Sequence, residues 1–360
     1  EMKGTIIQLL PNIGLVGGTA AKVRILAQQS DFRQVICYAY NPKNRIYLPK
    51  WECIDNAILV EKYSLSNPLK NAFLLVRLCN EYDATVIHAY FPIDSVSSAL
   101  AKILYPKIRI VRSFEGALHY SKWKRILQKC SFLFHNHHIA ISNYIKNFYR
   151  GIFGKYLKNI QTVYNCPAFE SHDNVCKHSS EHQYLLSIGG MNPTKNTETM
   201  IEAVKLLKDK GVNVQYHILG DGPLRQKIES MISEYHLENN VFLHGFRNDV
   251  KDFLSQCSVY VHPANLEGFG MAVVEAMSYK CPIIVSNSCA LPELIVNGES
   301  GFVVSTYDAQ AWCNKIEELL SNQNKMDYLG DNAHERFCSY FSTEIYVKTL
   351  DTIYSKLSNI

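Results

Sequence analysis

The feature that most constrains the fold of this chain is a regular alternation of short apolar runs with longer amphipathic stretches. Such an alternation is typical of βαβ units, in which buried strands of a parallel sheet are joined by covering helices. We expect seven strands in the first half of the chain, at residues 4–10, 34–40, 57–60, 85–88, 108–112, 138–141 and 160–164. We expect six in the second half, at residues 184–188, 214–219, 241–244, 259–262, 282–285 and 301–303. The sequence therefore predicts an α/β protein with two similarly organised halves.

The length of 360 residues also favours two domains, because single hydrophobic cores stop growing at about 250–300 residues. Residues 166–183 are rich in His, Ser, Asp and Asn and lack apolar periodicity, so we expect them to form a linker. We accordingly predict a Rossmann-like domain at 1–165 and a second at 184–335. Two such halves face each other across a cleft and bind ligands at the carboxyl ends of their strands. Residues 336–360 are predicted to be helical, with apolar residues at helical spacing: Tyr346, Leu350, Ile353, Tyr354 and Leu357.

The charge is distributed unequally between the two halves. Residues 1–165 contain 22 Lys and Arg against 9 Asp and Glu, whereas the rest of the chain contains 15 against 24. Anionic lipid, a diphosphate-bearing acceptor or nucleic acid would each suit the basic half. We do not expect a nucleic-acid partner, because the sequence contains no recognisable nucleic-acid-binding module.

Several features bear on the location of the protein. No run reaches the roughly 18 uncharged apolar residues that a membrane span requires, and the first residues do not resemble a signal peptide. The 11 cysteines are scattered without metal-type spacing, which favours free thiols in a reducing compartment. We therefore expect a cytoplasmic protein, and the basic half could contact the inner face of the membrane.

The segment from Pro263 to Met277 carries the most specific chemistry. It follows an apolar strand and opens a helix, and its glycines allow a tight turn that a ligand can approach closely. The N–H groups at the start of that helix form a ready anion site. Glu267 lies at the mouth of the turn, and Glu275 lies about a turn and a half into the helix, where its carboxylate can accept hydrogen bonds from a vicinal diol.

This segment, with its two glutamates eight residues apart around Glu-Gly-Phe-Gly, resembles the retaining glycosyltransferases of family 4, which have the GT-B fold. Other segments resemble motifs of that family and occur in its order: the phosphate loop at 187–196, the Gly-x-Gly-Pro turn at 220–223, residues 242–246 and the Pro-Glu segment at 292–301. In the first half, Gly14, Gly17 and Gly18 resemble the glycine loop that passes the donor diphosphate. Val163-Tyr-Asn165 resembles the motif that closes the first domain. In this fold the last helix crosses back to the first domain.

The resemblance implies a role for each matching residue. Glu275 would bind the ribose hydroxyls, Glu267 and the amides of the next turn would hold the transferred sugar, and Lys195 would neutralise the leaving diphosphate. The residues implied in donor binding are Gly17, Gly18, Gly190, Lys195, Gly220, Phe246, Phe269, Gly270, Met271, Ala272 and Glu275. Those expected on the acceptor or sugar side are His88, Glu115 and His119. No Asp-x-Asp stands where a divalent ion would chelate the diphosphate, so we expect neither a metal nor a cofactor.

The expected reaction is transfer of a hexosyl group, with retention, from a nucleotide sugar to a hydroxyl of a glycan or lipid-linked oligosaccharide. We expect a UDP-sugar, with a GDP-sugar as the alternative donor, and a place in surface polysaccharide biosynthesis. Two residues depart from the family pattern: Gly190 replaces the arginine of the phosphate loop, and Glu115 stands where a histidine is common. These departures leave a second hypothesis open, a catalytically weak glycosyltransferase-like scaffold subunit.

Residues 120–133 form an amphipathic pattern with two interpretations. Its apolar residues share one helical face, and Lys and Arg surround it; they are Trp123, Ile126, Leu127, Cys130 and Leu133. Either this face packs on the domain's own sheet, or the helix lies on an anionic lipid surface. A nuclease-like His135-Asn-His137 triplet lacks a metal-site framework, and the glycine pairs do not match the dinucleotide-binding fingerprint.

Overall fold

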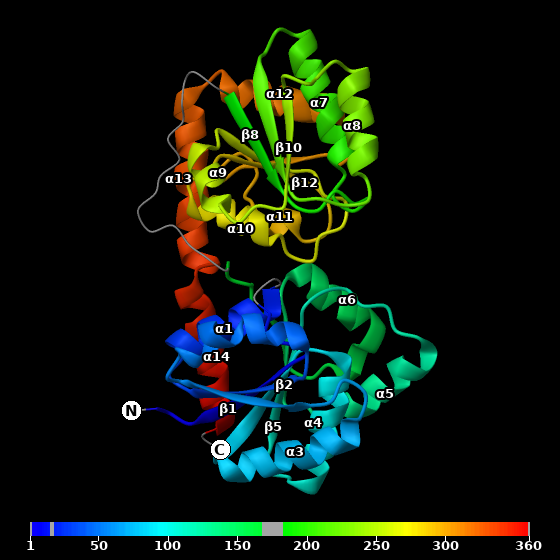
Figure 1. Cartoon of the computed structure of the whole chain (residues 1–360), viewed down its shortest axis with the longest axis vertical. Helices are drawn as coiled ribbons and strands as arrows, with labels where there is room; N and C mark the ends of the chain where they lie inside the picture. The colour runs from blue at the N-terminus through cyan, green and yellow to red at the C-terminus, as the bar shows by residue number, and fades with distance from the viewer. Residues whose placement is uncertain (1, 15–17, 168–182, 359–360) are drawn as a thin grey trace. The chain divides into compact units, whose positions relative to one another are not determined.

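The computed structural model describes residues 2–14, 18–167 and 183–358. The chain divides into two compact units (Figure 1). The first unit comprises Glu1–Ala168 together with Thr343–Ile360, and the second comprises Phe169–Ser342. Each unit contains one parallel sheet with helices on its faces (Figure 1). The predicted pair of Rossmann-like α/β domains is therefore confirmed.

The sheet of the first unit has the order β3-β2-β1-β4-β5-β6-β7. The strands are β1 Thr5–Leu10, β2 Arg33–Ala39, β3 Ala57–Tyr63, β4 Ala84–Ala89, β5 Arg109–Phe114, β6 His137–Ala140 and β7 Ile160–Thr162. The helices are α1 Gly18–Gln29, η1 Pro42–Ile46, α2 Leu48–Glu52, α3 Pro68–Glu81, α4 Pro92–Leu104, α5 Lys122–Phe132, α6 Asn143–Phe153 and η2 Gly154–Tyr156. Successive residues of β1 point to opposite faces of the sheet, so Ile7 packs with α3 and α4 while Ile6 packs with α1.

The sheet of the second unit has the order β10-β9-β8-β11-β12-β13. Its strands are β8 Gln183–Ile188, β9 Val214–Leu219, β10 Val241–Gly245, β11 Val259–His262, β12 Ile283–Ser286 and β13 Phe302–Val304. Its helices are α7 Thr197–Asp209, α8 Arg225–Glu234, α9 Val250–Gln256, α10 Met271–Ser278, α11 Leu291–Leu294, α12 Ala309–Leu320 and α13 Gln323–Tyr340. The strand order reverses between β8 and β11, and ligands of open α/β sheets bind at such a reversal.

The C-terminal helix α14, Thr343–Ser358, belongs to the first unit, as the fold prediction required. Its residues Leu350 and Tyr354 are buried in a core shared with β1, β4 and β5. Polar contacts fix the register, because Asp351 accepts hydrogen bonds from the Ser30 hydroxyl at 2.6 Å and the Asp31 amide at 2.9 Å. The return to the first unit begins at Thr343, because the preceding helix α13 packs on α10 within the second unit.

The orientation of α5 contradicts one of its two interpretations. The side chains that α5 buries are Gln128, Ser131 and Phe132, so its apolar stripe does not pack on the domain's own sheet. Trp123 is 82% exposed and Ile126 and Leu127 are about half exposed. The apolar stripe of α5 therefore points to solvent, while Phe132 on the other side of the helix packs against Phe114 of β5.

Candidate active site

Two loops meet at the strand reversal of the second unit. The loop after β8 carries Lys195, and the loop after β11 carries Glu267. Hydrogen bonds join the two loops: the Asn265 amide donates to the Thr194 carbonyl at 2.9 Å, and the Asn196 side chain donates to the Pro263 carbonyl at 3.1 Å. These bonds hold Lys195 and Glu267 together although they are 72 residues apart in sequence.

Lys195 and Glu267 form a partly buried ion pair with 2.5 Å between Nζ and Oε2. The side chain of Lys195 runs across the backbone at Gly189, where an added Cβ would lie 3.3 Å from its Cε. A side chain at position 189 would therefore press on the lysine. The two residues that the sequence predicts as catalytic are thus brought into direct contact.

His262, at the end of β11, also contacts Glu267. Its Nε2 lies 3.3 Å from Glu267 Oε2, and its Nδ1 lies 3.2 Å from the Tyr260 hydroxyl. Burial lowers the pKa of His262, so its ring is neutral near pH 7 and a neutral ring donates from one nitrogen. Sequence analysis missed this residue; the available signal was a polar residue at the end of an apolar strand, five positions before Glu267.

The charge of Glu267 is fixed by its neighbours. Burial acts to raise the pKa of this carboxyl, but its hydrogen bond with His262 and its contacts with Lys195 outweigh burial and lower the pKa to about 2. Glu267 is therefore ionised at any physiological pH, and it compensates the Lys195 ammonium. An anionic ligand that takes over Lys195 must compete with this carboxylate.

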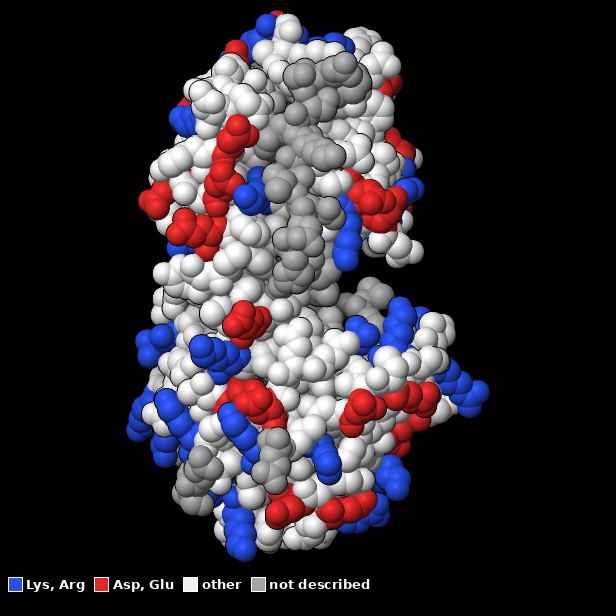
Figure 2. Space-filling view, turned by 90° about the vertical axis from the view of Figure 1, so that its left-hand side faces the viewer, with Lys and Arg blue, Asp and Glu red and all other residues white. Residues whose placement is uncertain are grey.

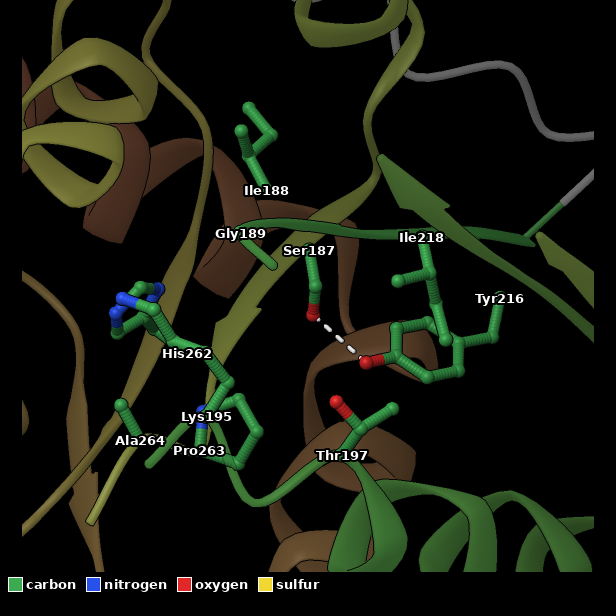
Figure 3. Close-up of a pocket in the computed structure, with 10 residues that line it drawn as sticks. All are labelled: Ser187, Ile188, Gly189, Lys195, Thr197, Tyr216, Ile218, His262, Pro263 and Ala264. Atoms are coloured by element: carbon green, nitrogen blue, oxygen red, sulfur yellow. Dashed lines mark hydrogen bonds between the residues drawn. The ribbon is translucent and has the colours of Figure 1, made fainter. Parts of the chain in front are cut away.

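A small cavity lies beside the ion pair (Figure 3). It has a volume of about 20 Å³, which is room for about one water molecule. Ser187 of β8 and Tyr216 of β9 line it and are joined by a 2.8 Å hydrogen bond. Lys195, in the loop after β8, and Thr197, the first residue of α7, line it as well (Figure 3). The cavity is too small for a sugar, so it is not itself a candidate donor pocket.

Helix α10 follows the turn that carries Glu267, and Gly270 is its N-cap residue. Gly270 has φ 107°, and a Cβ there would lie 3.0 Å from the side chains of Leu291 and Leu294. Both the backbone conformation and the close packing favour glycine. The first N–H groups of a helix have no intrahelical acceptor, so the amides of Met271 and Ala272 present partial positive charge at this point.

Glu275 lies in the second turn of α10. It is half-buried, and its carboxylate forms no hydrogen bond or ion pair within residues 2–14, 18–167 and 183–358. Burial raises its pKa to about 7. A carboxylate without a hydrogen-bond or ion-pair partner in the described part of the chain is suited to accept hydrogen bonds from a ligand; the predicted diol contact stays a prediction.

Replacing Glu275 by Gln is expected to stabilise the folded chain above pH 7. Since the pKa is about 7 in the folded chain against the ordinary 4.5, the carboxyl's contribution to stability is present at low pH and is lost as pH rises through 7. The variant should exceed the parent by on the order of 2 kcal/mol at pH 8 and match it at pH 4. Urea unfolding at both pH values measures this, with exposed Glu234→Gln as the control. Equal pH dependence in both variants would contradict the assignment.

The other predicted donor residues of the second unit occupy varied positions. Phe246 follows β10 and is 84% exposed, whereas the side chain of Phe269 is buried against Phe341. Gly220 approaches the backbone of Gly189 so closely that an added Cβ would lie 2.1 Å from its carbonyl oxygen. Phe269 and Gly220 could therefore serve a donor only through their backbones, and all three roles stay predictions.

Gly190, which replaces the arginine of the family's phosphate loop, packs closely against the turn at Asp221. A Cβ there would lie 3.1 Å from the carbonyl oxygen of Asp221, so a side chain fits only if the neighbouring turn moves. Arg225, the cation that could substitute, lies 2.9 Å from Glu229 and 3.4 Å from Asp221. The Arg225 guanidinium is therefore already paired with two carboxylates, whereas the ion pair with Glu267 is made by Lys195.

His88, expected on the acceptor side, lies in the core of the first unit. Its Nδ1 is 2.6 Å from the Tyr354 hydroxyl and its Nε2 is 2.7 Å from the Ser113 hydroxyl. Its ring also stacks on Tyr90. With both nitrogens occupied and no exposure, His88 connects α14 to the sheet, and a ligand would reach it only by displacing these partners.

Glu115, also expected on the acceptor side, forms an ion pair with Lys22. Lys22 is 1% exposed and also donates to the Asn165 side chain at 2.6 Å. Of the remaining predicted residues, His119 is exposed and packs edge-on against Phe148, and Gly18 begins α1. Gly17 lies outside the described residues. In the parts of the chain that are described, no three His, Cys, Asp or Glu are grouped to hold a metal ion.

The part of the chain that carries this site matches a known family of proteins. The family model described as "Glycosyl transferases group 1" matches residues 169–336, which contain the Lys195–Glu267 pair and α10. The chain is 28% identical to a Staphylococcus aureus poly(ribitol-phosphate) alpha-N-acetylglucosaminyltransferase, over 52% of this chain and 38% of that protein. It is 29% identical to the capsular polysaccharide biosynthesis glycosyltransferase CapM of S. aureus, over 47% of this chain and 44% of CapM. The chain thus matches less than half the length of these two relatives.

The fold as a whole has close counterparts among solved structures. Anabaena HepE in complex with UDP superposes with a TM-score of 0.81 at 18% identity, covering 98% of this chain and all of that one. The glycosyltransferase from Rickettsia africae superposes with the same score, covering 99% and 98%. The chain therefore has the two-domain Rossmann-like fold of GT-B glycosyltransferases.

Proposed function

We propose that this chain is a glycosyltransferase that uses a nucleotide sugar as donor and Lys195 and Glu267 as its central catalytic residues. The observation that carries the proposal is the ion pair between them, at 2.5 Å, whose carboxylate lies in the turn that precedes α10. Breaking the bond between a sugar and a nucleoside diphosphate builds negative charge on the leaving oxygen. An ammonium and oriented amides can stabilise that charge.

The donor we propose is a UDP-sugar, with a GDP-sugar as the alternative. The support is that HepE, which shares the fold, is described in complex with UDP. Glu275 would accept hydrogen bonds from the ribose hydroxyls. Metal independence, retention at the anomeric carbon and a cytoplasmic location belong to the same proposal. Turnover in EDTA and the anomeric configuration of the product by NMR would test the first two.

The acceptor we propose is a hydroxyl of a glycan or lipid-linked oligosaccharide in surface polysaccharide biosynthesis. The names of the two S. aureus relatives, which concern poly(ribitol-phosphate) and capsular polysaccharide, support this class.

Nucleoside diphosphates are expected to stabilise the second unit, because a ligand that binds only the folded state raises its stability by mass action. UDP at about 100 times its dissociation constant should add about 2.7 kcal/mol to the free energy of unfolding. A thermal-shift series with UDP, GDP, ADP and uridine measures this. A melting temperature that none of them changes would contradict the proposed donor site.

The scaffold hypothesis makes a different prediction for the same protein. A scaffold that retains only the fold would neither bind UDP nor release it from UDP-sugars. Slow hydrolysis of a UDP-sugar by the purified chain, abolished in a Lys195→Ala variant, would support the enzyme. A melting temperature that UDP leaves unchanged, together with no turnover of any donor, would favour the scaffold.

A further inference from the structure

The exposed face of α5 is apolar and is flanked by cations. Because an α-helix turns by about 100° per residue, the exposed apolar side chains lie on one side of the helix. They are Trp123, Ile126, Leu127 and Leu133, at 82%, 53%, 51% and 55% exposure. The opposite side is anchored in the unit, where Phe132 packs against Phe114 and Phe153 and the Gln128 side chain donates to the Pro92 carbonyl at 2.8 Å.

Cations flank this apolar stripe. Lys122, Lys124 and Arg125 are exposed and Lys129 is partly exposed, and the helix contains no acidic residue. The whole stretch 116–167 contains eight Lys and Arg and no Asp or Glu. The face of the first unit in Figure 2 carries Asp and Glu among its Lys and Arg, and α5 lies away from that face (Figures 1 and 2). Residues 116–167, which include α5 and α6, therefore supply most of the excess of cations, since residues 1–115 contain 14 Lys and Arg against nine Asp and Glu.

Helix α4, which packs against α5, also exposes apolar side chains. The α4 residues Ile103 and Leu104 are about half exposed. They follow Lys102, whose Nζ donates to the Phe134 carbonyl at 2.9 Å, and so they lie near the C-terminal end of α5. Contiguous exposed apolar surface that is rimmed by polar groups marks an interaction site.

We infer that the α5 face is a docking surface for an anionic lipid bilayer. Apolar side chains on one side of a helix and cations at its flanks match the boundary between acyl chains and anionic headgroups. Lys and Arg can extend their charged ends to the headgroups while their aliphatic stems stay on the apolar side. A second copy of this chain fits less well, because a symmetric pair would bring the same cations together without a compensating acid. This inference does not depend on the proposed transferase activity.

Vesicle binding by the full chain tests the inference. The protein should sediment with vesicles of phosphatidylcholine and phosphatidylglycerol, should not sediment with phosphatidylcholine alone, and should be released by salt. Trp123 supplies a local signal, because Trp51 and Trp312 are fully buried. Its fluorescence should shift to shorter wavelength on anionic vesicles, and Trp123→Phe should remove the shift while preserving binding.

Substitutions separate the apolar and the electrostatic contributions. A Lys124→Gln/Arg125→Gln variant should bind anionic vesicles about thirtyfold more weakly, given the attraction expected for two cations near such a surface. Leu127→Ser should also weaken binding. Matched controls in the same unit are Phe73→Ser and Lys62→Gln/Lys70→Gln, which change exposed side chains away from α5. All these positions are exposed, so the variants should retain the parent's melting temperature.

Three results would overturn the inference. The first is no binding to anionic vesicles, and the second is equal binding to neutral and anionic vesicles. The third is a dimer in the absence of lipid, seen by light scattering, that Leu127→Ser dissociates, since it would assign the face to a second copy of the chain.

Discussion

Lys195→Ala is expected to reduce turnover of the nucleotide sugar by about 10²- to 10³-fold, the usual effect of removing one donor from a developing oxyanion. Lys195 is positioned for this role by the two joined loops and by the absence of a side chain at Gly189. The loss should appear mainly in kcat, because the leaving oxygen carries more charge in the transition state than in the bound donor. Steady-state kinetics with a UDP-sugar measure both parameters.

The control for this variant is Lys205→Ala, which removes an exposed lysine of α7 that pairs with Asp209 at 3.0 Å. It should retain the parent's turnover. A folded Lys195→Ala protein with turnover within about threefold of the parent would remove Lys195 from the mechanism. Since the substitution leaves Glu267 without its ammonium partner, the melting temperature of the variant must be recorded together with its activity.

Glu115→Gln is expected to lower the free energy of unfolding of the first unit by about 3 kcal/mol, the scale of breaking a buried ion pair. The reason is Lys22, which is 1% exposed and would lose its carboxylate partner, while its hydrogen bond to the Asn165 side chain would remain. Replacing both charges, in Lys22→Met/Glu115→Gln, should recover most of the loss, because no buried charge is then left unpaired. Urea unfolding measures the three variants.

Exposed Glu61, in the same unit, provides the matched control as Glu61→Gln. If Glu115→Gln is no more destabilising than this control, the ion pair does not stabilise the fold. Lower turnover at unchanged stability would instead support the acceptor-side role that the sequence predicts for Glu115. The two roles are therefore separable by experiment.

The fold was accessible from sequence because it rests on local, repeated patterns. Each of the thirteen predicted strands has a counterpart within a few residues among the strands that the structure describes. The helical spacing of Leu350 and Tyr354 likewise predicted the buried face of α14. Runs of buried residues are dictated by the two faces of a parallel sheet, and those runs are visible in a single sequence.

Contacts between residues that are far apart in the sequence were harder to predict. Glu115 and its partner Lys22 are 93 residues apart, and neither position indicates the other. The amphipathic pattern of α5 identified an apolar stripe, but a stripe does not specify which side of a helix faces the protein. His262 was missed because an imidazole at the end of a strand acquires its meaning only from its surroundings, and here the loop that directly follows β11 turns back and places the Glu267 carboxylate 3.3 Å away.

The return of α14 to the first unit has a consequence for the order of events during synthesis. The core that surrounds Ile6 and Val86 includes Leu350 and Tyr354, which leave the ribosome after every residue of the second unit. Domains usually fold in order from the N-terminus as they emerge, but here the first unit must wait, with part of its apolar surface uncovered, until α14 has been synthesised. The second unit can acquire its native packing earlier, and a nascent chain stalled before residue 343 should expose the surface that chaperones recognise.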